Sequence, residues 1–149
     1  MINTINNYLK IIKGNKFIDY FDESNYEISA EDYCTVFSIN NRNYDNEIMV
    51  DGYISTDIAE FNIKELTYMY NGYEHSRTTL AILTKKNNYL DLETKMEDAT
   101  TLYDEEGEIV RTKKEKKEKT HKVFKIEEKD LNKNLLSNIE IIKPKVKTK

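Results

Sequence analysis

The dipeptide Asn71-Gly72 lies between two runs that favour β-strands, and it constrains the fold more than any other part of the sequence. The first run covers residues 61–70, and the second includes residues 79–83. Asn-Gly is the strongest short-range signal for a β-hairpin, because a type I′ turn requires a positive φ at both central residues. The sequence therefore predicts an antiparallel hairpin with a two-residue loop that places Tyr70 opposite Tyr73.

This loop length fixes a register for the two strands. It pairs Ile63 with Leu80 and Phe61 with Ile82, so these four apolar side chains share one face. A third predicted strand, residues 89–96, alternates cleanly, and a three-residue loop at 85–87 pairs its Leu90 and Leu92 with Ile82 and Leu80. The residues that we expect to point inward from this third strand are Leu90, Leu92, Thr94 and Met96.

Residues 33–39 and 48–55 form a second predicted hairpin, joined by a loop rich in Asn. The consistent apolar face pairs Ile39 with Ile48 and Phe37 with Val50. Gly52 interrupts the second of these strands, which indicates a β-bulge or a close approach of another backbone.

The N-terminal residues 4–13 have the periodicity of a short amphipathic helix. The apolar positions that follow this spacing are Ile5, Tyr8, Leu9 and Ile12. Gly14 follows at the place where a helix commonly ends on a left-handed residue. The apolar stripe predicts that the helix packs on a core.

The C-terminal third combines strand signals with a strong charge bias. Strands are expected at 98–103 and 108–112, joined by an acidic loop at 104–107 in which Gly107 supplies the unusual φ. Residues 113–119 contain no apolar side chain, so we expect a solvated loop or a protruding extension. A strand at 120–127 follows. Asp130 then begins a short helix through Leu131, Leu135 and Ile139, and residues 143–149 form a basic tail.

Together these elements predict one β-rich domain over residues 1–142, of mainly β or β-rich α+β class. About seven or eight antiparallel strands are expected, with a short helix near each end, because the connections are short and none has the length of a crossover. A single antiparallel sheet, a sandwich and a partly open barrel all fit this pattern.

Composition and motifs argue against most kinds of enzyme. No phosphate-binding glycine loop and no nucleophile elbow is present. Cys34, His75 and His121 match no zinc pattern, so we expect no metal and no cofactor. Twenty-seven acidic residues make chance pairs of carboxylates common. The carboxylates on or beside strands, Asp51, Asp57 and Asp91, therefore predict a solvated face rather than a catalytic pair.

The sequence shows no signal for export or membrane insertion. Its first residues lack a basic region followed by a long apolar run, so we expect no signal peptide, and no apolar run reaches the roughly 20 residues that a spanning helix needs. A single cysteine cannot form an internal disulfide, which suits a reducing compartment. We therefore expect a cytoplasmic protein without a membrane partner. The heavy use of Asn, Ile, Lys and Tyr matches an AT-rich genome, such as that of a low-GC bacterium, a mobile element or a virus such as a phage.

Charge is distributed unevenly along the chain. Residues 1–109 carry 9 basic and 21 acidic residues, a net charge of −12, and residues 110–149 carry 14 and 6, a net charge of +8. An acidic body can bind a basic groove on another protein, and its contributors here would be Glu60, Glu65, Asp91, Glu93 and Glu97. The basic segment could instead neutralise phosphates or simply solvate a loop. Its cations are Lys113, Lys114, Lys116, Lys117, Lys119, Lys122 and Lys125.

The aromatic residues near the Asn71-Gly72 turn form a second candidate surface: Tyr68, Tyr70, Tyr73 and His75. They either stiffen the hairpin by cross-strand pairing or provide a hot spot for a partner. We expect a small, soluble, non-enzymatic interaction protein, for example an inhibitor or accessory factor of a mobile element or virus, that binds a protein through its acidic body. The alternative is a nucleic-acid-binding module that works through residues 113–125.

Overall fold

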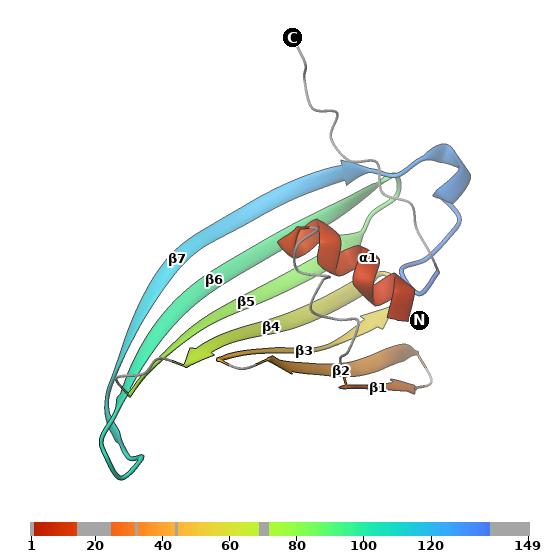
Figure 1. The fold of residues 1–149 in the computed structure, drawn as a ribbon. Coiled ribbons are helices and arrows are strands. Elements are labelled where there is room, and N and C mark those ends of the chain that lie inside the picture. The colour runs from red at the N-terminus through yellow and green to blue at the C-terminus, as the bar shows by residue number, and fades with distance from the viewer. Residues whose placement is uncertain (1, 15–24, 32, 44, 69–71, 138–149) are drawn as a thin grey trace.

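The computed structural model describes residues 2–14, 25–31, 33–43, 45–68 and 72–137, and within them seven strands form one antiparallel sheet (Figure 1). Strand order follows chain order, as expected when short connections join neighbouring strands. The strands are β1 (Asn25–Ala30), β2 (Cys34–Asn43), β3 (Asn46–Ser55), β4 (Ile58–Tyr68), β5 (Tyr73–Lys85), β6 (Tyr89–Tyr103) and β7 (Ile109–Lys125). The predicted class and strand number are confirmed, and of the three predicted architectures the single sheet is observed.

The sheet is curved, and helix α1 (Ile2–Lys13) lies across its concave face (Figure 1). Ile5, Tyr8 and Leu9 are buried against the sheet, which confirms the predicted helix and its apolar stripe. The helix ends at Gly14, which has a φ of 95° and donates its N–H to the carbonyl of Lys10 at 2.9 Å. The positive φ explains why glycine occupies this position.

The register predicted for β4 and β5 is wrong by one residue. Phe61 pairs with Ala81 rather than with Ile82, and Ile63 pairs with Thr79 rather than with Leu80. Leu80 and Ile82 therefore lie on the convex face. The ring of Phe61 contacts Tyr8 and Phe37, at centroid distances of 6.1 and 5.2 Å. Beside this aromatic cluster a small side chain fits well, and packing therefore outweighs the preferred turn.

The loop that this register implies also differs from the prediction. The last pair is Tyr68 with Glu74, which leaves residues 69–73 between them instead of two. The predicted pair of Tyr70 and Tyr73 involves Tyr70, which lies outside the described residues. Gly72 has a φ of 81°, in the left-handed region that favours glycine.

The pairing predicted between β5 and β6 is also wrong, although the inward face of β6 is correct. Leu92 pairs with Leu83 rather than with Leu80, and Leu90 pairs with Lys85 rather than with Ile82. The predicted inward residues of β6 divide into two buried ones, Leu90 and Leu92, and two partly exposed ones, Thr94 and Met96. The hydrophobic alternation of β6 thus identified its core face without identifying its partners.

The second hairpin keeps its predicted face but shifts by two residues. Ile39 pairs with Val50, and Phe37 pairs with Gly52. A Cβ atom at Gly52 would lie 2.0 Å from the carbonyl oxygen of Glu60 and 3.0 Å from Cζ of Phe37. The close approach predicted for Gly52 is confirmed, and the β2–β3 ladder runs through this residue without a bulge.

The prediction that residues 113–119 form a loop is wrong, because they lie in the middle of β7. Backbone pairing with β6 holds them, and such pairing needs no apolar side chain. β7 is an edge strand of the sheet, where lysines are common because they discourage pairing with other chains. The predicted strands at 98–103 and 108–112 are present, but as continuations of β6 and β7.

The turn between β6 and β7 matches its prediction. Gly107 has a φ of 83°, and Oδ1 of Asp104 accepts the N–H groups of Glu106 and Glu108, each at 2.9 Å. β7 has 17 residues and β6 has 15. The difference is taken up at two register shifts, where Lys117 and Val110 have no partner in β6.

After β7 the chain crosses toward α1. In place of the predicted helix beginning at Asp130, a 3₁₀ turn (Glu128–Asp130) ends at that residue. Leu135 is fully buried, and its carbonyl oxygen accepts a hydrogen bond from the hydroxyl of Tyr8 at 3.0 Å. Ile139 and the basic tail at 143–149 lie outside the described residues.

In the described part of the chain, no helix has the length and apolar character to cross a membrane.

Candidate functional site

Helix α1 lies over the concave face, and no described helix or strand covers the convex face of the sheet (Figure 1). Cross-strand pairing places its side chains in rows. One row runs from β2 to β7 through Val36, Tyr53, Glu60, Ile82, Glu93 and His121. Because each strand is held by two neighbours except at the edges, these side chains stand on a fixed backbone.

Acidic residues dominate this face from β1 to β6. Its carboxylates are Glu27, Glu47, Asp51, Glu60, Glu74, Asp91, Glu93 and Glu97, and its cations are Arg42, Lys64 and Lys95. The resulting excess is five negative charges. Four of the five carboxylates predicted to contribute share this face. Glu65 does not, because it lies on the concave face and pairs with Lys13 of α1 at 3.0 Å.

Apolar side chains lie within this acidic field. Val36 and Ile58 are 43% and 42% exposed, and Leu80 and Ile82 are partly exposed between them and the acidic residues of β6. A sheet face on which exposed apolar side chains alternate with charged ones offers both kinds of contact that protein interfaces use. We call the convex side chains of β1 to β6 the acidic face.

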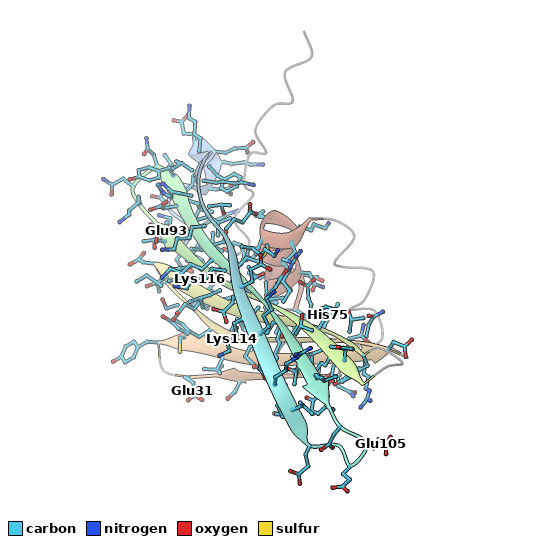
Figure 2. All side chains as sticks on the ribbon, turned by 90° about the vertical axis from the view of Figure 1, so that its left-hand side faces the viewer. Glu31, His75, Glu93, Glu105, Lys114 and Lys116 are labelled. Carbon is cyan, nitrogen blue, oxygen red and sulfur yellow. The ribbon has the colours of Figure 1, made fainter. Side chains whose placement is uncertain are left out.

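The convex side chains of β7 include lysines and no carboxylate. The lysines are Lys114, Lys116, Lys119 and Lys125. The two acidic residues of this strand, Glu115 and Glu118, both point to the concave face, and Lys117 in the bulge forms an ion pair with Glu115 at 3.2 Å. We call the convex cations of β7 the basic edge, and Figure 2 labels Lys114 and Lys116 on it.

The remaining lysines of the predicted basic segment are separated from this edge. Lys113 and Lys122 pair with Thr100 and Leu92 and share their concave side. Strand alternation therefore places lysines without carboxylates on the convex face of β7 and lysines together with glutamates on its concave face.

The predicted aromatic surface is not brought together. Tyr68 lies on the convex face, where its hydroxyl donates to Glu47 at 3.2 Å and its ring lies under the guanidinium of Arg42. Burial, with a smaller contribution from Glu47, raises the pKa of Tyr68. Tyr73 and His75 belong to the concave side, which Figure 2 shows opposite Glu93, and Tyr70 lies outside the described residues.

The concave face beyond α1 is polar. Nε and Nη2 of Arg77 donate to the two carboxylate oxygens of Asp98, at 2.8 and 3.0 Å. These hydrogen bonds lower the pKa of Asp98 and raise that of Arg77. Nδ1 of His75 lies 3.0 Å from Oγ1 of Thr100. These paired groups stabilise strand register.

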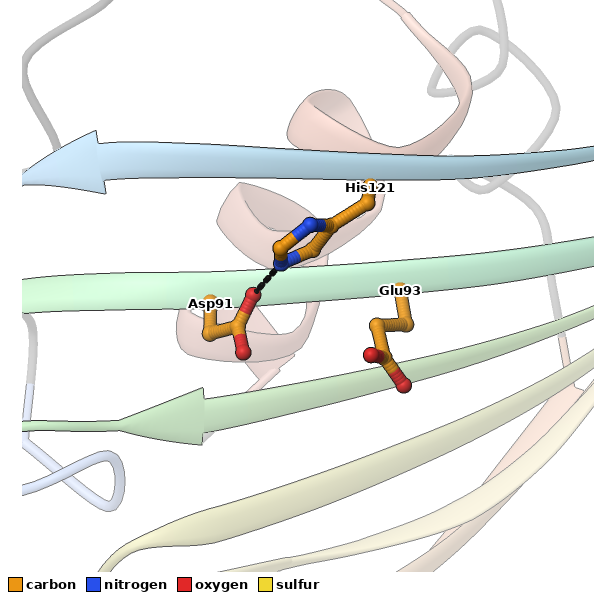
Figure 3. A group of neighbouring side chains, drawn as sticks. All are labelled: Asp91, Glu93 and His121. Carbon is orange, nitrogen blue, oxygen red and sulfur yellow. Dashed lines mark hydrogen bonds and ion pairs between the residues drawn. The ribbon is translucent and has the colours of Figure 1, made fainter.

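Sequence reasoning missed a cluster of Asp91, Glu93 and His121 on the convex face (Figure 3). Glu93 pairs directly with His121 across β6 and β7, and Asp91 is two residues away on the same face. Nε2 of His121 is hydrogen-bonded to Oδ1 of Asp91. The only available signal was the spacing of Asp91 and Glu93, since His121 joins them through a register that the sequence did not reveal.

The other carboxylates considered from sequence do not form a pair. Asp51 on β3 shares its row with Lys95 of β6, and Asp91 lies four residues further along β6, so strand spacing and rise place the two carboxylates about 20 Å apart. Asp57 lies in the β3–β4 turn, where its carbonyl accepts the N–H of Lys85.

Comparison of the chain with known proteins finds no matching family model, no similar curated protein and no similar solved structure.

Proposed function

We propose that the protein is a small non-enzymatic binding module whose acidic face docks a basic surface of a partner protein. The observation that carries this proposal is the uncovered convex face, on which partly exposed apolar side chains are surrounded by an excess of carboxylates. The two features have separate physical roles.

Affinity would come mainly from the partly exposed apolar side chains. Ile82 and Leu80 lie on neighbouring rows of β5, with Val36 and Ile58 on other strands of the same face. Each apolar square ångström removed from water contributes about 25 cal/mol. Because the strands are fixed by backbone pairing, little conformational entropy would be lost when a partner covers them.

Selectivity would come from charge. Carboxylates such as Asp51, Glu60 and Glu97 favour a partner that presents lysines or arginines, and they would speed its approach at low salt. The basic edge borders this field and would repel the same cations, so it would limit how far the partner extends toward β7. We further propose an intracellular partner, because a lone Cys34 suits a reducing compartment, and a role as an inhibitor or accessory factor of a mobile element or virus.

The test compares two variants with equal change of charge. The first, Asp51→Lys with Glu97→Lys, alters the acidic face, and the control, Glu105→Lys with Glu106→Lys, alters the exposed β6–β7 turn. Tagged proteins are purified from the native host lysate, and the stable partner is identified and titrated. We expect the first variant to lose the partner and the control to retain it. Retention by both variants, or equal loss, would contradict docking on the acidic face.

The basic edge supports a second candidate function, nucleic-acid binding. Residues two apart in a strand are about 6.8 Å apart, so Lys114, Lys116 and Lys119 form a cationic row without an intervening carboxylate on β7. Such a row would neutralise successive phosphates. The simpler interpretation is that these lysines protect the sheet edge.

This second candidate is tested by salt dependence. Replacing Lys114, Lys116 and Lys119 with Gln should reduce the slope of log K against log salt for single-stranded DNA or RNA by about 2. Replacing the concave Lys113 and Lys122 is the control, and it should change the slope less. Absence of salt-sensitive binding by the unmodified protein would remove this candidate. Aggregation of the Gln variant would instead support edge protection.

A further inference from the structure

The cluster of Asp91, Glu93 and His121 combines an imidazole with two carboxylates at one point of the sheet (Figure 3). One potential ligand atom from each residue lies within 4.8 Å of the other two. We propose that these three side chains form a surface site for a divalent transition-metal ion of zinc's class. This inference does not depend on the proposed function and is tested without a partner.

The donor set favours such an ion. Mg²⁺ and Ca²⁺ select oxygen ligands only, whereas Zn²⁺ and its neighbours bind imidazole nitrogen together with carboxylate oxygen. Three protein ligands leave a coordination position for water or another ligand, as in open zinc sites. The expected ion is therefore one that accepts one nitrogen and two oxygens and remains accessible from solvent.

The geometry requires only small movements. Bonds of about 2.1 Å to a tetrahedral ion hold ligand atoms about 3.4 Å apart. His121 and Asp91 already touch, so an ion would insert between Nε2 and Oδ1. Glu93 is exposed and reaches its place by rotating its own side chain.

The scaffold beneath the cluster is fixed. On the opposite face of β6, Leu90 and Leu92 are 0% and 2% exposed and belong to the hydrophobic core. They alternate with Asp91 and Glu93, so the backbone that holds both carboxylates cannot shift without disturbing the core. A site of this kind is pre-organised by the fold rather than by its own ligands.

Electrostatics provide a second reason. Among the described residues, none forms a hydrogen bond or an ion pair with the carboxylate of Glu93, and Asp91 beside it has the same charge. A dication would remove the repulsion between the two carboxylates. Lys95 and Lys119 occupy the next row and oppose binding of a cation. They predict moderate affinity, and they offer a variant in which binding becomes tighter.

The experiment titrates the full metal-free chain with ZnCl₂ by isothermal titration calorimetry. The absorption spectrum of added Co²⁺ gives a second readout of coordination. We expect one saturable site per chain. His121→Ala should weaken Zn²⁺ binding by at least about tenfold, and Glu93→Gln should also weaken it. The matched control is His75→Ala, since His75 is the other histidine and lies on the concave face. It should leave the affinity unchanged.

Charge supplies the opposite test. Lys119→Gln removes a cation from the neighbouring row and should tighten Zn²⁺ binding, whereas loss of Lys113 on the concave side should have little effect. All these side chains are exposed, and circular dichroism checks that each variant is folded. The proposal is overturned if the unmodified chain binds no Zn²⁺ saturably, if His121→Ala binds within twofold of it, or if His75→Ala loses binding equally.

Discussion

The two halves of the β6–β7 hairpin share their strands but differ in what holds them. In the inner half, residues 89–96 with 118–125, the concave side chains Leu90, Leu92 and Phe124 join the core. In the outer half, residues 97–103 with 109–116, no side chain belongs to that core. Backbone pairing, the Arg77–Asp98 ion pair and the ordered turn at Asp104 hold the outer half instead.

The difference shows that strand pairing and core packing impose separate demands on a sequence. The inner half requires apolar residues at Leu90, Leu92 and Phe124, because these positions are buried in the core. The outer half has no such position and relies on backbone pairing, so lysines can occupy both faces of its β7 strand. Its side chains can therefore vary with little loss of stability, whereas those three core positions cannot.

The largest expected effect tests this division directly. Leu92 and Leu102 are on the same strand and the same face, ten residues apart, but only Leu92 lies in the core. Leu92→Ala should lower the free energy of unfolding by about 3–4 kcal/mol through lost burial and a cavity. Leu102→Ala should lower it by about 1 kcal/mol. Urea denaturation measures both, and equal losses would show that the two halves are stabilised alike.

A second prediction compares two glycines. Gly52→Ala, in the covered part of the sheet, forces a Cβ against the Glu60 carbonyl and should cost about 3 kcal/mol. Gly107 lies in the outer turn with no atom within 4 Å of a new Cβ, but its φ is positive. Gly107→Ala should therefore cost about 1–2 kcal/mol. Thermal denaturation distinguishes them, and a larger loss at Gly107 would contradict the steric argument.

A smaller effect is expected where α1 meets the C-terminal segment. Tyr8→Phe removes the hydroxyl that donates to the carbonyl of Leu135 and leaves a buried acceptor without that partner. The variant should lose about 1 kcal/mol of unfolding free energy, with little change in fluorescence or circular dichroism of the native state. No measurable loss would mean that water replaces the hydroxyl.

The smallest effect concerns the outer half and depends on pH. The folded state lowers the pKa of Asp98 through Arg77, so the pair stabilises the fold above the unfolded pKa of about 3.9. That contribution disappears as the pH falls through the lower folded pKa. Arg77→Gln should cost about 0.2–1 kcal/mol at pH 7, and its difference from the unmodified protein should shrink toward pH 3.

The control for this last comparison is Arg111→Gln. Arg111 is a cation of the same half that forms no ion pair among the described residues. Its replacement should not produce a difference that fades with acidification. If it does, the pH effect reflects overall charge rather than the Arg77–Asp98 pair.

Much of the fold could be predicted because local signals agreed with the tertiary structure. The α1 stripe and the inward face of β6 follow from the spacing of apolar residues, and the turn at Gly107 and the close approach at Gly52 follow from a glycine in a recognisable place. The β4–β5 register could not be predicted in this way. It depends on how Ala81 packs beside Phe61, and the Asn71-Gly72 turn signal carries no information about that contact.

The functional candidates were harder to predict for a similar reason. Composition led us to expect a loop at 113–119, because it reports side-chain packing and not backbone pairing with β6. Asp91 and His121 are thirty residues apart and meet only through strand register. The division between an acidic face and a basic edge likewise depends on which way each residue points along β7.

Lys117 has a further consequence for how this strand can change in length. Because it is the extra residue of a bulge, Glu115 and Glu118 share a face although they are three positions apart. Deletion of Lys117 would make the pairing of β6 with β7 regular at this point. All the remaining side chains of β7 would keep the face on which they now lie. Homologous chains could therefore differ by one residue at this place and still keep their lysines and glutamates apart.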